Sequence, residues 1–267
     1  MKTLLCATAL LASVSAAHAA DPFDVPVTAE LLDGWQQADG TRVSAIRLTL
    51  ADGWKTYWRV PGDAGIPPQF DWKGSQNMAG IKVQWPTPKV FDQNGMRSVG
   101  YSNQVILPLV ISAKNAAQPV DLELSMDIGV CADICVPEKL TLSGTMDAQS
   151  STPVSAIAAA LAERPYSASE AGAGNVTCTM SPSQDGLNIT ATLQLPSTGG
   201  TEHVVIETGR DDVWVSEAVT SRNGKTLTAT SEMVPVTTGA LGLDRSAMRF
   251  TVLGSSYAVD LHGCTSG

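Results

Sequence analysis

The chain has 267 residues, 17 basic against 26 acidic side chains, and a formal net charge of −9 at pH 7. An acidic surface repels polyanions, which argues against nucleic acid and anionic lipid as partners. The length is sufficient for one large domain or for two domains of ordinary size.

The amino-terminal residues have the features of a secretory signal peptide. Lys2 gives a positive start, an apolar run covers 4–14, and Ala17-His18-Ala19 is an A-x-A cleavage site. We therefore expect residues 1–20 to be a signal peptide that directs the protein to the periplasm. The apolar run is shorter than the roughly 20 residues of a membrane helix, and no later run is as long, so we expect no membrane insertion. Export removes Cys6 and leaves four cysteines.

The first half of the chain has the pattern of an antiparallel β-sandwich. Apolar and polar residues alternate in short runs, which is typical of half-buried strands. Five of the six tryptophans also lie in the first third of the chain, which indicates a core different from that of the second half. We predict a domain over 21–147, with strands at 42–50, 81–85, 104–112, 120–128 and 139–142.

Cys131 and Cys135 are separated by only three residues. In an extended strand their α-carbons would be roughly 13 Å apart, whereas a disulfide needs about 4.4 to 6.8 Å. The chain must therefore turn between them, and we expect the pair at an exposed hairpin tip. A bridge over so short a loop constrains the unfolded chain very little, so redox or metal chemistry is a better reason for it than stability.

The composition changes to Ser, Pro and Ala after position 147, which predicts a linker over 148–174 with a short helix at 154–163. Strand patterns then resume, with hairpin signals at Asp185-Gly186 and Asn223-Gly224. We predict a second, smaller sandwich over 175–267. Its strands are expected at 176–180, 187–195, 203–207, 227–230, 248–253 and 257–261. The predicted fold class is thus all-β, with two sandwich domains joined by a linker.

Cys178 and Cys264 lie at opposite ends of the second half. The exported compartment is oxidising, so an even number of cysteines predicts disulfides. A bridge between these two would tie the first strand to the end of the chain. The chain-entropy model assigns such a bridge an upper limit of about 4 to 5 kcal/mol. We interpret this pair as structural; the alternative is that either thiol pairs with a partner protein.

Several motifs in the first half match a known family in their order along the chain. They are Asp52-Gly53-Trp54 with Tyr57, Val83 to Pro86, Phe91-Asp92, Tyr101, Val105 to Leu109, and Cys131-Ala132-Asp133 through Cys135 to Pro137-Glu138. In these residues the first half resembles the N-terminal periplasmic domain of DsbD-type thiol:disulfide interchange reductases. A further stretch, Tyr57 to Asp63 with Gly65 to Pro68, is similar to a subgroup of that family.

The resemblance implies an immunoglobulin-like sandwich whose cysteine pair relays electrons. A membrane-embedded thiol reductase would be the donor and a periplasmic thioredoxin-like protein the acceptor. By the family pattern, Cys135 would bond to the partner and Cys131 would resolve the mixed disulfide. The chain departs from that pattern in two ways. Three residues instead of five separate the cysteines, and no membrane or thioredoxin part is expected in this sequence.

Several residues around the pair are candidates for shaping the site. The family covers its cysteines with a cap loop, and the matching stretch here runs from Asp92 to Met96, so Phe91 or Met96 could cover the sulfurs. Asp133 and Glu138 would raise the pKa of the thiols and Lys139 would lower it. Trp54 and Tyr57 match aromatic positions near the family's cysteines, and both could equally be core residues.

Two other functions fit parts of the sequence. Soft thiolates select Cu(I), so the pair together with His203 or His262 could handle copper, although both histidines lie in the second half. Alternatively, two sandwiches could form a binding module whose cysteines are all structural. The sequence has no glycine-rich phosphate loop, zinc-type histidine cluster or nucleophile elbow, so we expect no cofactor.

Overall fold

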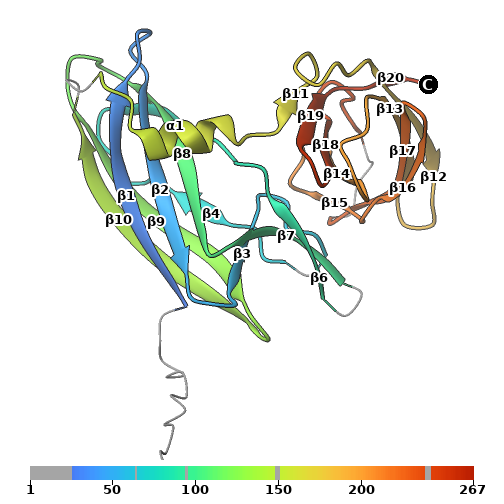
Figure 1. Cartoon of the computed structure of the whole chain (residues 1–267), viewed down its shortest axis with the longest axis horizontal. Helices are drawn as coiled ribbons and strands as arrows, with labels where there is room; N and C mark the ends of the chain where they lie inside the picture. Colours follow the sequence, from blue (N-terminus) through green and yellow to red (C-terminus); the bar gives the residue numbers. More distant parts are fainter. Residues whose placement is uncertain (1–25, 64, 94–95, 148–150, 238–241) are drawn as a thin grey trace, which may run out of the picture.

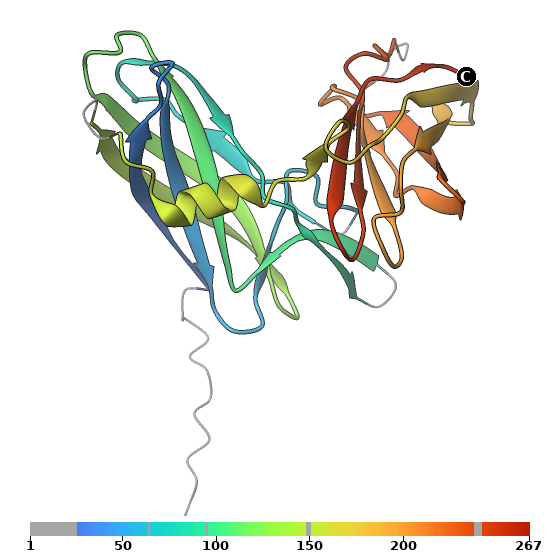
Figure 2. The same cartoon turned by 45° about the horizontal axis from the view of Figure 1, so that its top comes forward.

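A computed structural model describes residues 26–63, 65–93, 96–147, 151–237 and 242–267. The predicted signal peptide, 1–20, lies outside the described residues. Figures 1 and 2 show two halves built of strands, with one helix lying along the first half. The predicted all-β class is therefore confirmed.

The first half is a sandwich of two antiparallel sheets. One sheet has the strand order β1-β2-β8-β5, and the other has the order β10-β9-β3-β7-β6, with β4 beside β9. The strands are β1 (Val27–Gln36), β2 (Arg42–Leu50), β3 (Lys55–Tyr57), β4 (Gln69–Asp71), β5 (Met78–Val83), β6 (Lys89–Gln93), β7 (Met96–Ser102), β8 (Gln104–Ala113), β9 (Val120–Cys131) and β10 (Cys135–Met146).

The core of the first half lies between these sheets. Alternate residues of β9 from Val120 to Val130 point into it, around the fully buried ring of Trp58. The predicted strand 120–128 continues to Cys131, and the strand predicted at 81–85 ends at Val83. Trp85 packs on the core from a loop instead, since Pro86 and Pro88 follow it and have no backbone N–H to continue a ladder.

The helix α1 (Ser155–Ala162) packs on the outer face of the sheet that contains β2 and β8. Its Ile157 is fully buried in a small cluster with Val43 and Ala45. The short helix of the predicted linker, 148–174, therefore packs on the first half. The sequence pattern predicted the helix but not its contact with the sheet. That contact depends on the small cluster of Ile157, Val43 and Ala45, which lies outside the main core.

The second half contains two further sheets with their own core. The orders are β11-β19-β18-β14 and β15-β17-β13-β12-β20, with β16 beside β17. Phe250, Ile189 and Leu193 are fully buried between them. The strands are β11 (Tyr166–Ser167), β12 (Val176–Pro182), β13 (Leu187–Gln194), β14 (His203–Glu207), β15 (Val213–Val215), β16 (Val219–Asn223), β17 (Thr226–Pro235), β18 (Arg249–Leu253), β19 (Ala258–His262) and β20 (Thr265–Ser266).

A polar contact centred on Arg59 joins the two halves. Its guanidinium lies 3.7 Å from the centre of the Trp58 ring and donates to both carboxylate oxygens of Glu207, at 2.9 to 3.3 Å. A further bond reaches the Thr251 hydroxyl at 3.1 Å. A bidentate, stacked arginine is held in a fixed geometry. The contact therefore fixes β14 of the second half against the chain that follows β3.

Candidate redox site

Cys131 and Cys135 form a disulfide across the end of the β9–β10 hairpin. Cys131 is the last residue of β9, Cys135 is the first of β10, and the two are cross-strand partners. Their α-carbons lie 4.1 Å apart and their sulfurs 2.13 Å apart. The three intervening residues make the turn that the spacing requires, and Ile134 within it is 69 % exposed.

The two cysteines differ in their access to solvent. Cys131 is buried, with 4 % of its surface exposed, whereas Cys135 is exposed. In thiol–disulfide exchange, the attacking thiolate must be able to reach the sulfur that it attacks. Of these two cysteines, Cys135 is therefore the one that a large partner can approach in the folded protein.

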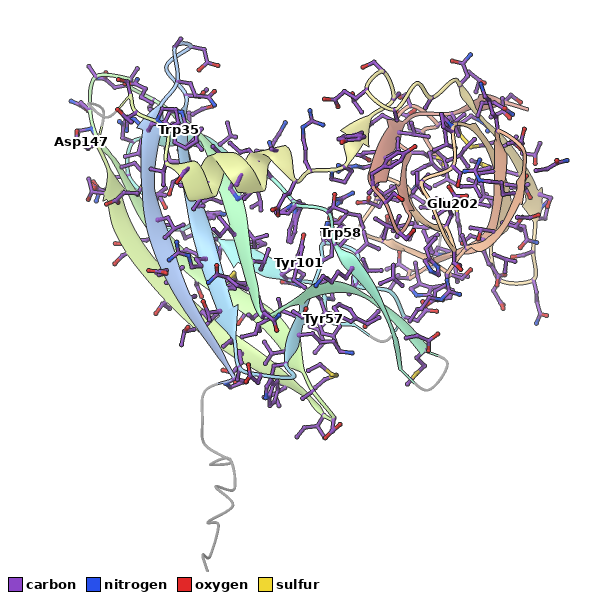
Figure 3. All side chains as sticks on the ribbon, in the orientation of Figure 1. Trp35, Tyr57, Trp58, Tyr101, Asp147 and Glu202 are labelled. Atoms are coloured by element: carbon purple, nitrogen blue, oxygen red, sulfur yellow. A yellow bond between two sulfur atoms is a disulfide. The ribbon has the colours of Figure 1, made fainter. Side chains whose placement is uncertain are left out.

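The disulfide lies on the outer face of its sheet. Side chains of a strand alternate between faces, and Val130 and Trp58 point into the core. Cys131 and Tyr57 therefore point the other way. Figure 3 labels Tyr57 and Trp58 on the side of the first half that is nearer to the second half.

Tyr57 is the polar neighbour of the accessible sulfur. Its hydroxyl lies 3.2 Å from the Sγ of Cys135, on a side chain that is only 3 % exposed. Burial raises the pKa of the Tyr57 phenol, so the hydroxyl keeps its proton across the physiological range. It can therefore donate a hydrogen bond to a Cys135 thiolate after reduction.

Two glycines make room for the Tyr57 ring. A Cβ on Gly65 would lie 2.8 Å from a ring carbon, and a Cβ on Gly129 would lie 3.0 Å from two others and 2.7 Å from the Cβ of Ile66. Real Cβ atoms do not approach so closely, so only glycine fits here. The loop after β3, and in particular Gly65 and Ile66, thus covers the outer face beside the disulfide. Gly129, a glycine inside strand β9, is the sequence signal that indicates such a close approach.

Replacing Tyr57 with phenylalanine should slow exchange at Cys135 without unfolding the protein. The ring stays between the two glycines, but the thiolate loses a donor, and its pKa should rise by about one unit, equivalent to ~1.4 kcal/mol. At pH 7 the thiolate fraction would then fall up to tenfold. Alkylation rates of the reduced protein measured against pH would show this shift, and an unchanged profile would contradict it.

A family model for the N-terminal part of the thiol:disulfide interchange protein DsbD matches residues 28–146. This segment is a DsbD-type N-terminal domain. The resemblance in its motifs is therefore confirmed. The matched family is one of thiol:disulfide interchange proteins, and the matched residues include both Cys131 and Cys135.

The wider fold is similar to the solved structure of the N-terminal periplasmic domain of ScsB from Proteus mirabilis. The TM-score is 0.70 at 20 % identity, and the alignment covers 93 % of this chain and 97 % of that chain. At this identity the similarity shows a shared fold, which includes the second half as well as the DsbD-type domain. A search of curated proteins finds no match.

The stretch predicted to cap the cysteines runs from Asp92 to Met96, and its Met96 end does not reach the disulfide. Met96 is 58 % exposed and lies six residues along β7 from Ser102. Lys55 pairs with both Ser102 and Cys131, so these three residues lie at one level of the sheet. Because a strand rises about 3.3 Å per residue, Met96 lies about 20 Å along β7 from the level of Cys131. Phe91 lies on the same outer face, where the buried Lys55 Nζ is 5.2 Å from its ring centre. Asp92 is exposed, opposite Arg97.

The charged residues next to the cysteines of the DsbD-type domain project into solvent to different degrees. Asp133 is exposed in the turn and Glu138 is half-buried in β10. Lys139 forms an exposed ion pair with Asp127 at 3.5 Å. Within the part of the chain that the structure describes, no hydrogen bond or ion pair joins Asp133 or Glu138 to the sulfurs. Trp54 packs against the core.

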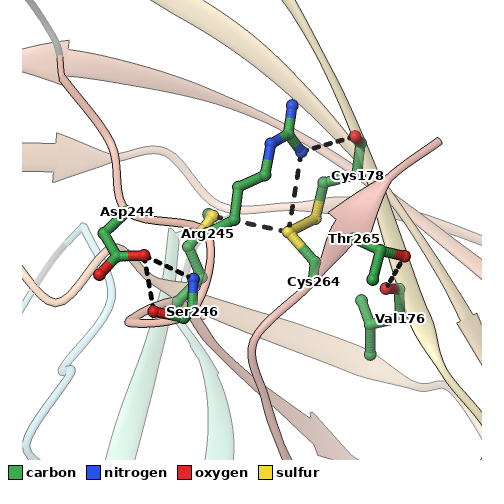
Figure 4. Close-up of a disulfide and its surroundings, with 8 residues drawn as sticks. Val176, Cys178, Asp244, Arg245, Ser246, Cys264 and Thr265 are labelled. Carbon is green, nitrogen blue, oxygen red and sulfur yellow. Dashed lines mark hydrogen bonds between the residues drawn. A yellow bond between two sulfur atoms is a disulfide. The ribbon is translucent and has the colours of Figure 1, made fainter.

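The second disulfide lies outside the DsbD-type domain and joins Cys178 to Cys264, whose α-carbons are 5.8 Å apart (Figure 4). Cys178 is fully buried. Arg245 donates to the Cys178 carbonyl at 2.7 Å and covers the bridge. The bridge spans 86 positions and ties β12 to the end of the chain.

The two histidines weighed for copper lie in the second half, away from the hairpin of the DsbD-type domain. His203 Nδ1 is 2.7 Å from the Arg97 guanidinium, and burial together with that cation lowers the pKa of His203. His262 lies beside Asp260 at 3.4 Å. The described residues contain no group of three metal-ligating side chains, and none of their helices is long and apolar enough to cross a membrane.

Proposed function

We propose that the protein carries out thiol:disulfide interchange in the periplasm through Cys131 and Cys135. A membrane-embedded thiol reductase would reduce the pair, and the pair would then reduce a periplasmic thioredoxin-like protein. The observation that carries this proposal is the arrangement of the pair, with one exposed and one buried cysteine at a hairpin tip of a DsbD-type domain.

The exchange proceeds in two steps that balance. The Cys135 thiolate attacks one sulfur of the partner's disulfide, forming a bond between the proteins and releasing the partner's other cysteine as a thiolate. The Cys131 thiolate then attacks the Cys135 sulfur, closing the internal bridge and releasing the partner's second thiolate. The partner gains two electrons and takes up two protons from solvent.

The burial of the two sulfurs supports different roles for the two cysteines. A thiolate that attacks another protein must be exposed, which fits Cys135. The resolving thiolate needs only to reach Cys135, its cross-strand partner, and burial protects Cys131 from competing disulfides. Tyr57 would stabilise the attacking thiolate from the covered side.

A redox titration with mapping of the thiols tests the proposal. The oxidised protein is equilibrated in glutathione buffers, its thiols are alkylated, and the labelled cysteines are identified by mass. We expect Cys131 and Cys135 to be labelled together, with circular dichroism unchanged, while Cys178 and Cys264 stay bridged. A Cys131–Cys135 bridge that opens only when the protein unfolds would instead make it a structural staple.

A further inference from the structure

A cavity of 660 Å³ lies between the two halves. The loop after β3 lines it from the first half, and β14, β15 and the residues up to Ala218 line it from the second. Its walls are mainly apolar, although Arg59, Arg97 and Arg210 also reach it. The apolar contributors include Val60, Pro67, Val90, Val205, Val213 and Trp214.

Two strands that lie at the edges of their sheets line this cavity. Among the described residues, β14 pairs only with β18, and β15 pairs only with β17. An edge strand presents backbone N–H and C=O groups that a further extended segment can pair with. Apolar walls beside such edges suit an extended polypeptide with apolar side chains.

The edge of β14 is held in place by the first half. Alternate residues of the strand face that half: His203 contacts Arg97, Val205 packs on the first core, and Glu207 is bound by Arg59. The cavity is therefore preformed, and a segment that enters it does not have to order this strand.

The cavity shares part of its lining with the loop that covers the redox site. Gly65 and Pro67 line it, and Gly65 also lies against the Tyr57 ring. The hydroxyl of that ring contacts Cys135. A protein bonded to Cys135 is thus within reach of the cavity, and both contacts can form in one complex.

The charges at the cavity indicate which segment it would accept. Arg59, Arg97 and Arg210 are paired with Glu207, Glu217 and Asp212. Asp63 and Asp211, which are exposed at the rim, have no ion pair among the described residues. A bound segment with a lysine or arginine beside its apolar residues would complement them.

We propose that this cavity binds an extended apolar segment, flanked by a basic residue, of the same thioredoxin-like protein that exchanges disulfides with Cys135. The inference rests on the proposed function. It assigns a role to the second half, which would supply two strand edges for partner binding and add non-covalent contacts to the sulfur chemistry.

The test compares two aromatic residues with equal exposure. Trp214 lines the cavity and Tyr166 does not, and each is 45 % exposed. Each is replaced with alanine. For each variant, the reduced protein is reacted with an oxidised exported thioredoxin-like protein that has a C-x-x-C motif, and separately with glutathione disulfide. The readout is the ratio of the two second-order rate constants.

We expect Trp214→Ala to lower this ratio about tenfold, which corresponds to ~1.4 kcal/mol, and Tyr166→Ala to leave it unchanged. The same ratio in the wild-type protein, Trp214→Ala and Tyr166→Ala would overturn the docking proposal. A cavity that binds a small ligand instead of the partner protein would give this result. A wild-type protein that reacts with neither disulfide would overturn the proposed function itself.

A second measurement tests strand addition directly. The Cys131→Ala variant is joined to the same thioredoxin-like protein through Cys135, and hydrogen exchange is compared in the free and joined states. We expect amide exchange at 203–207 and 213–215 to slow at least about tenfold in the complex. Unchanged exchange at both strands would show that no strand pairs there.

Discussion

Replacing Cys131 with alanine should leave Cys135 in a stable mixed disulfide with its partner. Cys135 is the exposed cysteine of the pair, so it still attacks, but the thiol of the buried cysteine that would release the partner is gone. A mixed disulfide that is resolved only by external thiols persists for much longer. Non-reducing electrophoresis after mixing with an oxidised thioredoxin-like protein should show one new species, which reductant removes.

The matched control is Cys135→Ala. Cys131 is then the remaining thiol of the pair, and with 4 % of its surface exposed it should trap little or no partner. The yields of the two variants should differ by at least about tenfold. Equal trapping by both would contradict the assigned roles, and stronger trapping through Cys131 would reverse them. Mass mapping of the crosslinked peptides identifies the cysteine in each case.

Replacing both Cys178 and Cys264 with alanine should destabilise the second half by up to about 4 to 5 kcal/mol. The bridge closes a loop of 86 positions, and the chain-entropy model gives this value as an upper limit. Cys178 is also fully buried, so the loss of its sulfur removes packing in the core. Chemical denaturation followed by segment-resolved hydrogen exchange should show the loss in β12, β13 and β17.

The control for this prediction is the double variant Cys131→Ala with Cys135→Ala. Its loop spans only 4 positions, for which the same model gives about 2 kcal/mol. A similar loss of stability in both double variants would contradict the separation into a structural bridge and a working one. The Cys178/Cys264 variant should retain exchange at Cys135 under conditions in which it stays folded.

The fold could be predicted from sequence where the pattern is local and periodic. The runs at 42–50 and 203–207 coincide with β2 and β14, because apolar residues recur along each run with the short period of a strand. Short strands such as β3 and β15 have three residues each, too few for a period to be visible. Whether such segments are strands is decided by their neighbours in the sheet and not by their own residues.

The redox site was predictable in part, for a similar reason. Three residues between two cysteines require a turn whatever surrounds them, and the family motifs lie in order along the chain. The cover over the site was not predictable. The stretch from Asp92 to Met96 had the matching position in the sequence, but the β6–β7 register directs Met96 away, and the loop that contains Gly65 and Ile66 lies over Tyr57 instead.

The sequence by itself determined the two cysteine pairs, the all-β class and the match to the DsbD N-terminal family, because these depend on spacing, alternation and local motifs. Only the tertiary structure decided that Cys135 is exposed while Cys131 is buried, that the Tyr57 hydroxyl lies on the Cys135 sulfur, and that Arg59 joins the halves. The Tyr57 and Arg59 contacts bring together residues more than 70 positions apart. The different burial of the two cysteines depends on strand register and on what covers the sheet. Cross-strand register and packing between sheets set such distances, and no local pattern encodes them.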